Sequence, residues 1–433
     1  MSDVYDTQPR LLKEPRGGVP DVIATLDQYH QACESLANAS GSLAADAERA
    51  SGFRYGHEDW LIQFKREGAG IILLDPIALT QAGADWAAFN QAVGQSTWIL
   101  HDSLMDLPGF ADIGLKPQGL FDTEIAARLL GMHRFGLAAV TERYLGITLA
   151  KEHSAADWSY RPLPRDWRNY AALDVEVLIE LETLMRRDLK ASGKEEWANE
   201  EFDYALRKGM EPKKPHPVPW MRISRITELS RDRQALAIAK SLWEERDRLA
   251  RHYDIAPSLL LADSSIIEAA QKKPHNAAQF RMIRSLNERV RIHTGTEQDK
   301  MFERYAPIQR AVKPKTWKTA IDRALALKPG QWPQMPVPDQ DESGLINAPR
   351  SMRLWKQRHP DRYERLQRVR KVINQIAVDT RTPAEIVIKP QIVRNLCWAE
   401  DAANLDVEAF LREQGARDWQ VRLIAPSVSG AIM

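Results

Sequence analysis

The sequence has few of the features that define secreted or membrane proteins. It contains only two cysteines, Cys33 and Cys397, which lie far apart in 433 residues. A disulfide framework or a zinc–cysteine site is therefore not expected, and a reducing cytoplasm is the predicted location. The segment Met1 to Pro20 is polar and lacks an apolar core, and no apolar run reaches the roughly 18 residues of a membrane span. Neither a secretory signal nor a membrane association is predicted.

The net charge of +1 conceals an asymmetry between the two halves of the chain. Residues 1–209 hold 21 Lys and Arg against 32 Asp and Glu, a net of −11. Residues 210–433 hold 39 Lys and Arg against 27 Asp and Glu, a net of +12. An acidic half fits a site that gathers carboxylates around metal ions, and a basic half fits a surface that attracts a polyanion. Alone, this division makes nucleic acid only a plausible ligand.

Two proline-rich stretches divide the chain into three expected domains. The first linker, residues 209–219, contains four prolines, and the second, residues 328–349, contains five. Proline lacks a backbone donor and restricts its predecessor, so neither stretch favours a helix or a central strand. The predicted domains are residues 1–210, with a core at about 24–205, residues 220–327 and residues 350–425. No strong internal repeat is evident.

The first domain is predicted to be α/β and the other two all-helical. Apolar runs at residues 42–48, 60–64, 70–75 and 97–101 have the length and composition of strands, and helical periodicity follows at 125–130 and 171–184. Beyond residue 220 only helical periodicity appears. One apolar stripe runs from Leu236 to Leu249 and another from Tyr363 to Ile376.

The first predicted strand ends in the acidic segment Asp46-Ala47-Glu48. Side chains two residues apart on a strand leave the same face, so these two carboxylates can share a pair of metal ions. A second Asp-x-Glu occurs at Asp122-Thr123-Glu124, directly before a helical pattern. There Asp122 or Thr123 would cap the helix, so Asp122 and Glu124 are interpreted as structural.

A further acidic residue, Asp106, follows the predicted strand that ends at His101. Its rival is Asp102, which is well placed as a helix N-cap, whereas Asp106 lies one turn further along. Taken singly, each is more simply explained by capping or by a solvated turn. His101 is expected to be a buried histidine with a hydrogen-bond partner rather than a metal ligand.

Tyr170 and Asp174 are four residues apart in a helical pattern and therefore lie on one face. The alanines between them, Ala171 and Ala172, are small enough for close packing onto a sheet. A phenol is a poor base at neutral pH but a good hydrogen-bonding group for orienting a water. The alternative for Tyr170 is a half-buried aromatic side chain without a chemical role.

Together, the four carboxylates of Asp46, Glu48, Asp106 and Asp174 come from three separated segments. Hard divalent cations prefer oxygen ligands, and two such ions suffice to activate a water and stabilise a leaving oxygen in phosphodiester cleavage. The set therefore predicts a two-metal site.

In this order, the motifs resemble the tyrosine-containing ribonuclease D branch of the DEDD exonucleases. Asp46 and Glu48 match the first motif, Asp106 with Leu107-Pro108-Gly109-Phe110 the second, and Tyr170 and Asp174 the third, over residues from about 24 to 205. The second domain resembles the helicase-and-RNase-D C-terminal (HRDC) domain, and the third looks like a diverged copy. Three residues differ from those usual in the family: Ala47 stands where the family usually has Thr, Trp167 where Gln is common, and Asp102 where a small residue or Asn is usual.

The resemblance implies a ribonuclease H-like exonuclease domain followed by two HRDC-type domains. It also implies two divalent ions, Mg²⁺ or Mn²⁺, held by the four carboxylates, with Tyr170 orienting the attacking water. The expected activity is hydrolysis of RNA from a single-stranded 3′ end to 5′-mononucleotides, for example in trimming tRNA precursors, and no obligate protein partner is evident. The alternatives are a DNA 3′–5′ exonuclease and a catalytically silent RNA-binding adaptor.

Overall fold

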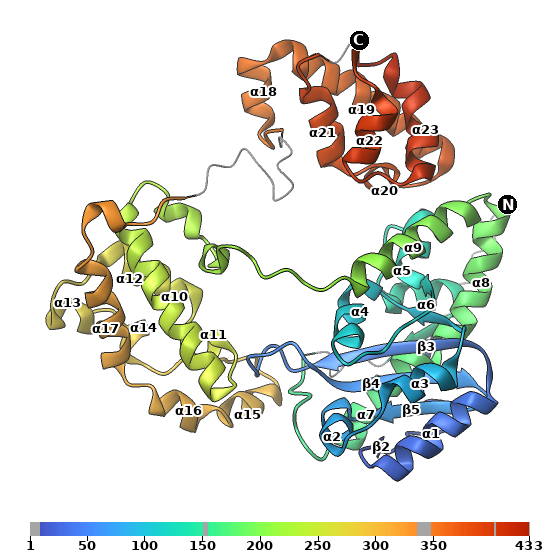
Figure 1. Ribbon diagram of the computed structural model, residues 1–433, viewed down its shortest axis with the longest axis horizontal. Coiled ribbons are helices and arrows are strands. Elements are labelled where there is room, and N and C mark those ends of the chain that lie inside the picture. The colour runs from blue at the N-terminus through green and yellow to red at the C-terminus, as the bar shows by residue number, and fades with distance from the viewer. Residues whose placement is uncertain (1–8, 150–154, 336–347, 402–403, 433) are drawn as a thin grey trace.

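The computed structural model describes residues 9–149, 155–335, 348–401 and 404–432, which form three bodies (Figure 1). The first body is built on a six-stranded sheet in the order β2–β5–β4–β3–β6–β7. The strands are β2 (Val22–Ile23), β3 (Ser40–Arg49), β4 (Asp59–Glu67), β5 (Gly70–Leu74), β6 (Thr97–Leu100) and β7 (Gly119–Asp122). Strand β4 is antiparallel to β3 and β5, whereas β2–β5, β3–β6 and β6–β7 are parallel pairs. A separate two-stranded sheet joins β1 (Arg10–Leu12) to β8 (Ile147–Leu149).

Helices cover this sheet and connect its strands. They are α1 (Leu26–Asn38), α2 (Pro76–Ala82), α3 (Trp86–Val93), α4 (Ser103–Asp112), α5 (Thr123–Leu129), α6 (Leu137–Leu145), α7 (Arg165–Glu176), α8 (Leu178–Ala191) and α9 (Glu195–Met210). The predicted α/β class is confirmed. The periodic segment 171–184, however, is not one helix, because the chain breaks between α7 and α8 at Val177. Both helices still bury their apolar faces, so the apolar periodicity of the sequence does not reveal the break.

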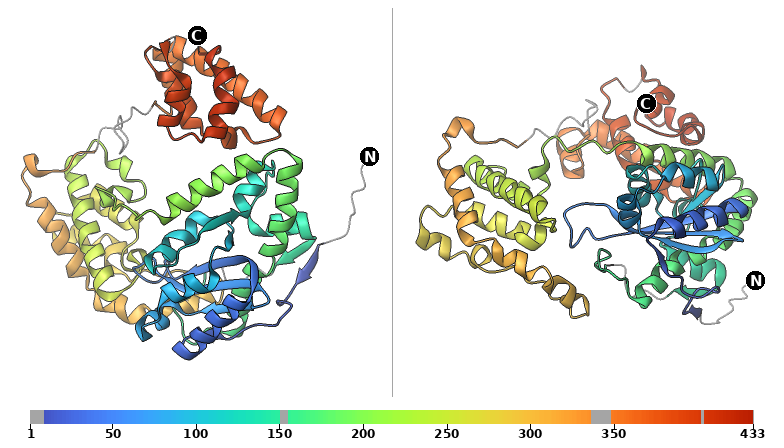
Figure 2. Two further views of the ribbon diagram at one scale, coloured as in Figure 1. Left: turned by 45° about the vertical axis from the view of Figure 1, so that its right-hand side comes forward. Right: turned by 60° about the horizontal axis from the view of Figure 1, so that its bottom comes forward.

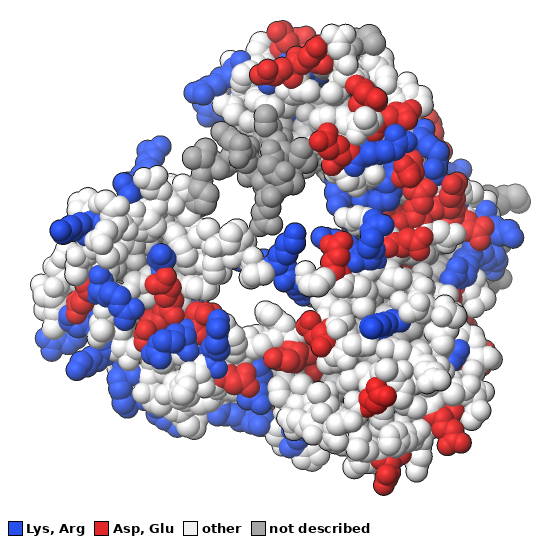
Figure 3. Space-filling model, in the orientation of Figure 1, with Lys and Arg blue, Asp and Glu red and all other residues white. Residues whose placement is uncertain are grey.

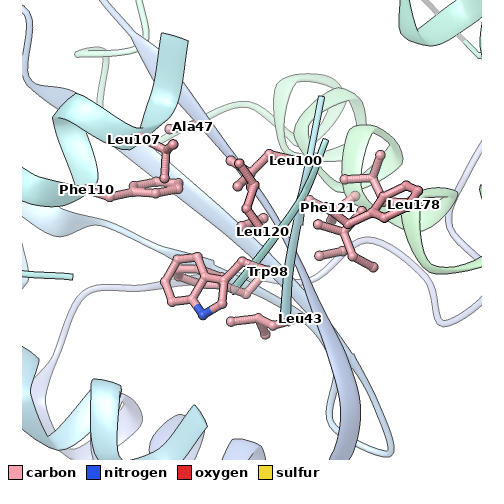
Figure 4. Close-up of a cluster of buried hydrophobic side chains, with 14 of the residues drawn as sticks. Leu43, Ala47, Trp98, Leu100, Leu107, Phe110, Leu120, Phe121 and Leu178 are labelled. Carbon is pink, nitrogen blue, oxygen red and sulfur yellow. The ribbon is translucent and has the colours of Figure 1, made fainter. Parts of the chain in front are cut away.

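The core of the first body lies around the central strands. Figure 4 shows Leu43 and Ala47 of β3, Trp98 and Leu100 of β6, and Phe121 of β7 with their buried neighbours. Trp98 is fully buried and makes edge contacts with the rings of Phe64 and Phe110. Burying these large side chains fixes β3 in the middle of the sheet, which positions the acidic residues on that strand.

The second and third bodies are helical, as predicted, and each has its own apolar core. The second contains η1 (Pro219–Arg222), η2 (Ile226–Leu229), α10 (Arg233–Tyr253), α11 (Pro257–Leu260), α12 (Asp263–Lys272), α13 (Ala277–Arg281), α14 (Arg284–Asn287), α15 (Gln298–Glu303), α16 (Ala306–Ala311), α17 (Pro314–Leu325) and η3 (Pro329–Gln331). The third contains α18 (Met352–Arg358), α19 (Pro360–Thr380), α20 (Ala384–Val387), α21 (Pro390–Trp398), α22 (Val407–Glu413) and α23 (Asp418–Ser429). The first expected linker begins slightly later than predicted, since α9 continues to Met210; much of the second, residues 336–347, lies outside the described residues. None of the helices in the described ranges combines the length and hydropathy needed to cross a membrane.

The two helical bodies share a succession of elements. In both, a helix of 21 residues, α10 or α19, ends at a residue with left-handed backbone, and a four-residue helix and then a longer helix follow. Each of these three helices starts 127 residues after its counterpart: Arg233 and Pro360, Pro257 and Ala384, Asp263 and Pro390. This spacing supports a duplicated origin, although the HRDC-like character of the third body stays a prediction.

The hairpin between β3 and β4 joins the first body to the second (Figures 1 and 2). Phe53 of the hairpin is buried in the core of the second body and stacks on Phe302, with ring centroids 4.5 Å apart. Its carbonyl accepts a hydrogen bond from the Ala256 amide at 2.8 Å, and Arg54 pairs with Asp254 at 3.1 Å. The hairpin therefore fastens the second body a few residues beyond Glu48.

The third body packs on α9. Trp419 stacks on Trp197 at 4.7 Å, and Arg417 pairs with Glu201 at 2.8 Å. The buried Lys194 donates to the Leu129 carbonyl at 2.6 Å and to Thr382 Oγ1 at 2.9 Å. An aromatic stack and several charged contacts thus hold this body against the sheet domain.

Candidate metal centre

The first pair of predicted ligands lies on the central strand. Asp46 and Glu48 are two residues apart on β3, so their side chains emerge from the same face of the sheet. Across the antiparallel pairing, Asp46 lies opposite Gln63, whose side-chain amide donates to Asp46 Oδ2 at 3.4 Å. The backbone pairing with β4 therefore orients this pair, while β6 pairs with β3 at the preceding residues Leu43 and Ala44.

Helix α7 carries the third motif and packs across β3, β4 and β5. Ala171 and Ala172 are fully buried, which lets the helix lie close to the sheet. Lys65 of β4 fixes the C-terminal end of α7, because its ammonium pairs with the Glu176 carboxylate at 3.0 Å and donates to the Glu176 carbonyl at 2.6 Å. These contacts set the position of Asp174 above the strand.

The carboxylates of Asp46, Glu48 and Asp174 meet at one point. Each offers an oxygen, and these oxygens all lie within 4.8 Å of one another. Burial raises the pKa of Asp46 and of Glu48 well above its usual value, and repulsion between the neighbouring carboxylates acts in the same direction. Burial also raises the pKa of Asp174 to about 7. Acidic groups held this close are stabilised when a cation lies among them.

Asp106, the fourth predicted ligand, is close enough to raise the pKa of the other three but has a different partner. It lies in the first turn of α4, is 4% exposed, and accepts a hydrogen bond from Arg49 at 2.7 Å. The same guanidinium lies 2.8 Å from Asp59 at the start of β4. Burial raises the pKa of Asp106 to about 6, and Arg49 opposes this shift. The arginine neutralises a carboxylate at the edge of the acidic cluster.

Tyr170 lies beside the cluster, one helical turn before Asp174. Burial raises the pKa of its phenol, and the charges of Asp174 and Glu48 add to this shift. The phenol therefore keeps its proton at neutral pH and acts as a hydrogen-bond donor rather than a base.

The rival acidic residues are placed outside the cluster. Asp122 caps α5, as predicted: it is 1% exposed and accepts from the amides of Glu124 at 2.8 Å and Ile125 at 3.1 Å. Its other oxygen accepts from the Ser103 amide at 2.7 Å and so also supports the start of α4.

Asp102 occupies the predicted N-cap position of α4, but the prediction that its side chain caps the helix is wrong. Its backbone is left-handed, with φ of 59°, and its side chain makes no capping bond. Asp122, at the end of the neighbouring strand β7, supplies the acceptor instead. His101 is partly buried and has a hydrogen-bond partner, as expected: its Nδ1 lies 2.8 Å from Thr123 Oγ1.

Sequence reasoning missed the residues that surround the cluster. Arg49 and Gln63 each contact a proposed ligand, Lys65 fixes the helix that carries Asp174, and Asp59 shares the guanidinium of Arg49 with Asp106. No sequence signal indicates Arg49, because strict alternation along the strand would place it on the face opposite Glu48, and the register shift between Glu48 and Arg49 is visible only in the pairing with β4. No sequence signal indicates Asp59, because its contact depends on how the hairpin turns back into β4.

Comparisons with known proteins agree with this geometry. Residues 20–190 match the family model described as 3′–5′ exonuclease, residues 235–297 match the HRDC domain, and residues 348–432 match the 3′ to 5′ exonuclease C-terminal domain. The chain thus combines an exonuclease domain with helical accessory domains. The last of these matches covers the third body.

The chain belongs to the ribonuclease D family. It is 30% identical over 230 residues to ribonuclease D from Shewanella sp. (strain ANA-3), an alignment that covers 52% of this chain and 58% of that relative. A crystal structure of a protein from Bifidobacterium adolescentis shares 69% identity with a TM-score of 0.92, over 98% of this chain and 99% of the other. The crystal structure of Escherichia coli RNase D has the same fold, with a TM-score of 0.60 and 22% identity over 95% and 98% of the two chains.

Proposed function

We propose that this protein is a metal-dependent 3′–5′ exoribonuclease that releases 5′-mononucleotides. The observation that carries the proposal is the convergence of the Asp46, Glu48 and Asp174 oxygens within 4.8 Å in a protein of the ribonuclease D family. Clustered buried acids destabilise a fold, and a nucleic-acid-binding adaptor has no use for them. Their retention together with Tyr170 favours an active nuclease over the adaptor.

The donor set fits Mg²⁺ or Mn²⁺, because it consists of carboxylate oxygens that repel one another in the absence of a cation. Asp46, Glu48, Asp106 and Asp174 would hold two ions. Such ions supply a nucleophilic hydroxide at neutral pH and stabilise the leaving oxygen of an in-line displacement. Asp106 can take part once its carboxylate turns from Arg49.

The protein's own groups contribute positioning and binding. Tyr170, protonated at neutral pH, would orient the attacking water through its hydroxyl. The helical bodies carry the basic excess of the chain, and Figure 3 shows Lys and Arg side chains along the lower edge of the second body. These cations would contact phosphates and make RNA binding salt-dependent.

We propose structured RNA with a single-stranded 3′ end, such as a tRNA precursor, as the substrate. Escherichia coli RNase D is described as an exoribonuclease involved in structured RNA processing, which supports this substrate class for a chain of the same family. A cytoplasmic location stays part of the same prediction.

The test is an assay of RNA and DNA oligonucleotides of the same sequence, each labelled at the 3′ end, with Mg²⁺, Mn²⁺ or a chelator. We expect labelled mononucleotides from RNA only when a metal is present. Asp174→Asn should abolish their release, whereas Asp112→Asn, an exposed acid on the same helix as Asp106, should leave it unchanged. Faster cleavage of DNA would favour the DNA exonuclease, and binding of intact RNA with either metal would favour the adaptor.

A further inference from the structure

A cavity of about 570 Å³ lies between the exonuclease domain and α15 of the second body. Tyr160, Pro164 and Trp167 line it from the exonuclease side, and Lys300, Met301 and Arg304 line it from the other. Its volume is within the range of pockets that enclose a small organic group such as a nucleobase. None of the residues proposed as metal ligands lines this cavity.

A chain of aromatic rings connects the cavity with the metal centre. The Trp167 ring lies 6.1 Å from Tyr160 and 5.5 Å from Trp158, and Trp158 in turn lies 6.2 Å from Tyr170. Trp167 and Asp174 are seven residues apart on α7, which is two helical turns on one face and about 10 Å along the axis. A strand whose 3′ end occupies the metal centre therefore reaches the cavity within its first few nucleotides.

The cavity is pre-formed, because contacts between the two bodies hold both of its walls. Tyr305 is buried and donates to Asp157 Oδ2 at 3.0 Å, and Arg304 pairs with the same carboxylate at 3.4 Å. Met301 packs against the apolar cluster that contains Trp158 and Trp167. A ligand would thus enter a shaped space without reorganising the interface, which reduces the entropic cost of binding.

The chemistry of the lining favours a base over a phosphate. The Arg304 guanidinium lies 4.6 Å from the centre of the Tyr160 ring, and Tyr160 is 36% exposed. Aromatic rings and guanidinium planes are the groups on which unpaired RNA bases stack. Two carboxylates, Asp166 and Glu297, and two cations, Lys300 and Arg304, line the cavity, so the lining carries no excess of positive charge that would select a phosphate. The carboxylates can accept hydrogen bonds from base amino groups.

We infer that this cavity is a subsite for one nucleobase of the RNA strand, a short distance to the 5′ side of the nucleotide being removed. The base stacks against Tyr160 and Arg304, with Trp167 and Met301 forming the apolar walls. The inference rests on the proposed function and adds a position at which the enzyme grips single-stranded RNA. Since two bodies build the subsite, it also gives the second body a direct part in holding the substrate.

The test measures binding without cleavage, in full-length protein carrying Asp174→Asn. A single-stranded RNA is prepared with an abasic nucleotide at each successive position from the 3′ end, and the affinity of each RNA is measured. Stacking of a base on an aromatic side chain corresponds to about 5- to 150-fold in affinity. We expect a loss of this size at one interior position, with smaller losses at its neighbours.

Adding Tyr160→Ala should weaken binding of the unmodified RNA by a similar factor and remove the penalty of the abasic nucleotide at that position. Tyr160→Phe should retain both, because the ring is kept. Tyr204→Ala is the matched control, since Arg417 covers the Tyr204 ring at 4.3 Å in the same manner but at the interface with the third body. It should leave the abasic profile unchanged.

Failure of the subsite and failure of the proposed nuclease activity would give different results. RNA binding with no position-specific loss, or a loss that persists in Tyr160→Ala, would overturn the subsite and leave the proposed function intact. Protein without Asp174→Asn that bound RNA with the expected profile but failed to cleave it would overturn the proposed activity and leave the subsite. Failure of the Asp174→Asn protein to bind RNA at all would overturn both.

Discussion

Arg49→Met should destabilise the metal-free protein and strengthen metal binding. The Arg49 guanidinium pairs with two buried carboxylates, that of Asp106 at 2.7 Å and that of Asp59 at 2.8 Å. Asp106 and Asp59 are each 4% exposed. Methionine keeps the unbranched apolar stem of the side chain and removes the charged guanidinium. Both acids then lose the group that opposes the effect of burial on their pKa values, about 6 for Asp106 and about 7 for Asp59.

The expected loss in the free energy of unfolding is about 3 kcal/mol at pH 8, since removing one partner of a buried pair costs roughly 3–5 kcal/mol. The loss should shrink toward pH 6. Both acids have folded-state pKa values raised above those of the unfolded chain, so protonation favours the folded variant as the pH falls. The affinity for metal should rise by about tenfold or more, because Arg49 no longer competes with the metal ion for the Asp106 carboxylate. An ion pair of this kind is worth up to about 4 kcal/mol at an effective dielectric constant of 20, and each 1.4 kcal/mol corresponds to about tenfold in affinity.

The assay combines urea unfolding in chelator at pH 6 and pH 8 with calorimetric titration of Mn²⁺. Arg161→Met is the matched control, because Arg161 pairs with the buried Asp75 at 2.6 Å in the same domain and its other hydrogen bonds go to backbone carbonyls, not to a proposed ligand. This control should lose stability but keep the Mn²⁺ affinity of the wild type. Equal or weaker Mn²⁺ binding by Arg49→Met would refute the competition and make Arg49 a simple structural cation.

Three further changes test other parts of the structure. Tyr170→Phe should slow RNA cleavage by on the order of 100-fold or more while Mn²⁺ affinity, measured by calorimetry, stays constant; an unchanged rate would make the ring structural. Asp122→Asn should cost about 3 kcal/mol or more in urea unfolding, because one carboxylate accepts three backbone amides, and a loss below about 1 kcal/mol would contradict this account. Burial lowers the pKa of Lys194 to about 8, so the unfolded chain binds more protons than the folded chain between pH 8 and about 10. The free energy of unfolding of the wild type should therefore rise relative to Lys194→Met by on the order of 1 kcal/mol per pH unit in that window, and parallel curves from pH 7.5 to 9.5 would refute this.

The strands and helices that form the core follow directly from local patterns in the sequence. The runs at 42–48 and 60–64 lie within β3 and β4, because apolar residues with strand propensity also fill the centre of the sheet. The four-residue strand β7 was not predicted. It begins with a glycine and ends with an aspartate, both of low strand propensity, and it forms because β6 provides a parallel partner.

The candidate site was predictable only in part. The Asp-x-Glu pair and the Tyr170–Asp174 spacing each indicate one face of one element, and the fold brings these faces together at Asp46, Glu48 and Asp174. The pairing of Asp106 with Arg49, and the help that Asp122 gives to the start of α4, depend on contacts between distant elements. No local pattern encodes them, because each arises only after the sheet has formed.

The hairpin that follows β3 also has a thermodynamic consequence. Glu48 and Phe53 are five residues apart, so one short segment belongs both to the proposed metal centre and to the interface with the second body. A ligand that shifts the second body changes the restraint on this segment, and its binding is then coupled to metal binding. Such coupling is reciprocal: metal ions must alter the affinity for that ligand by the same factor as the ligand alters the affinity for the ions.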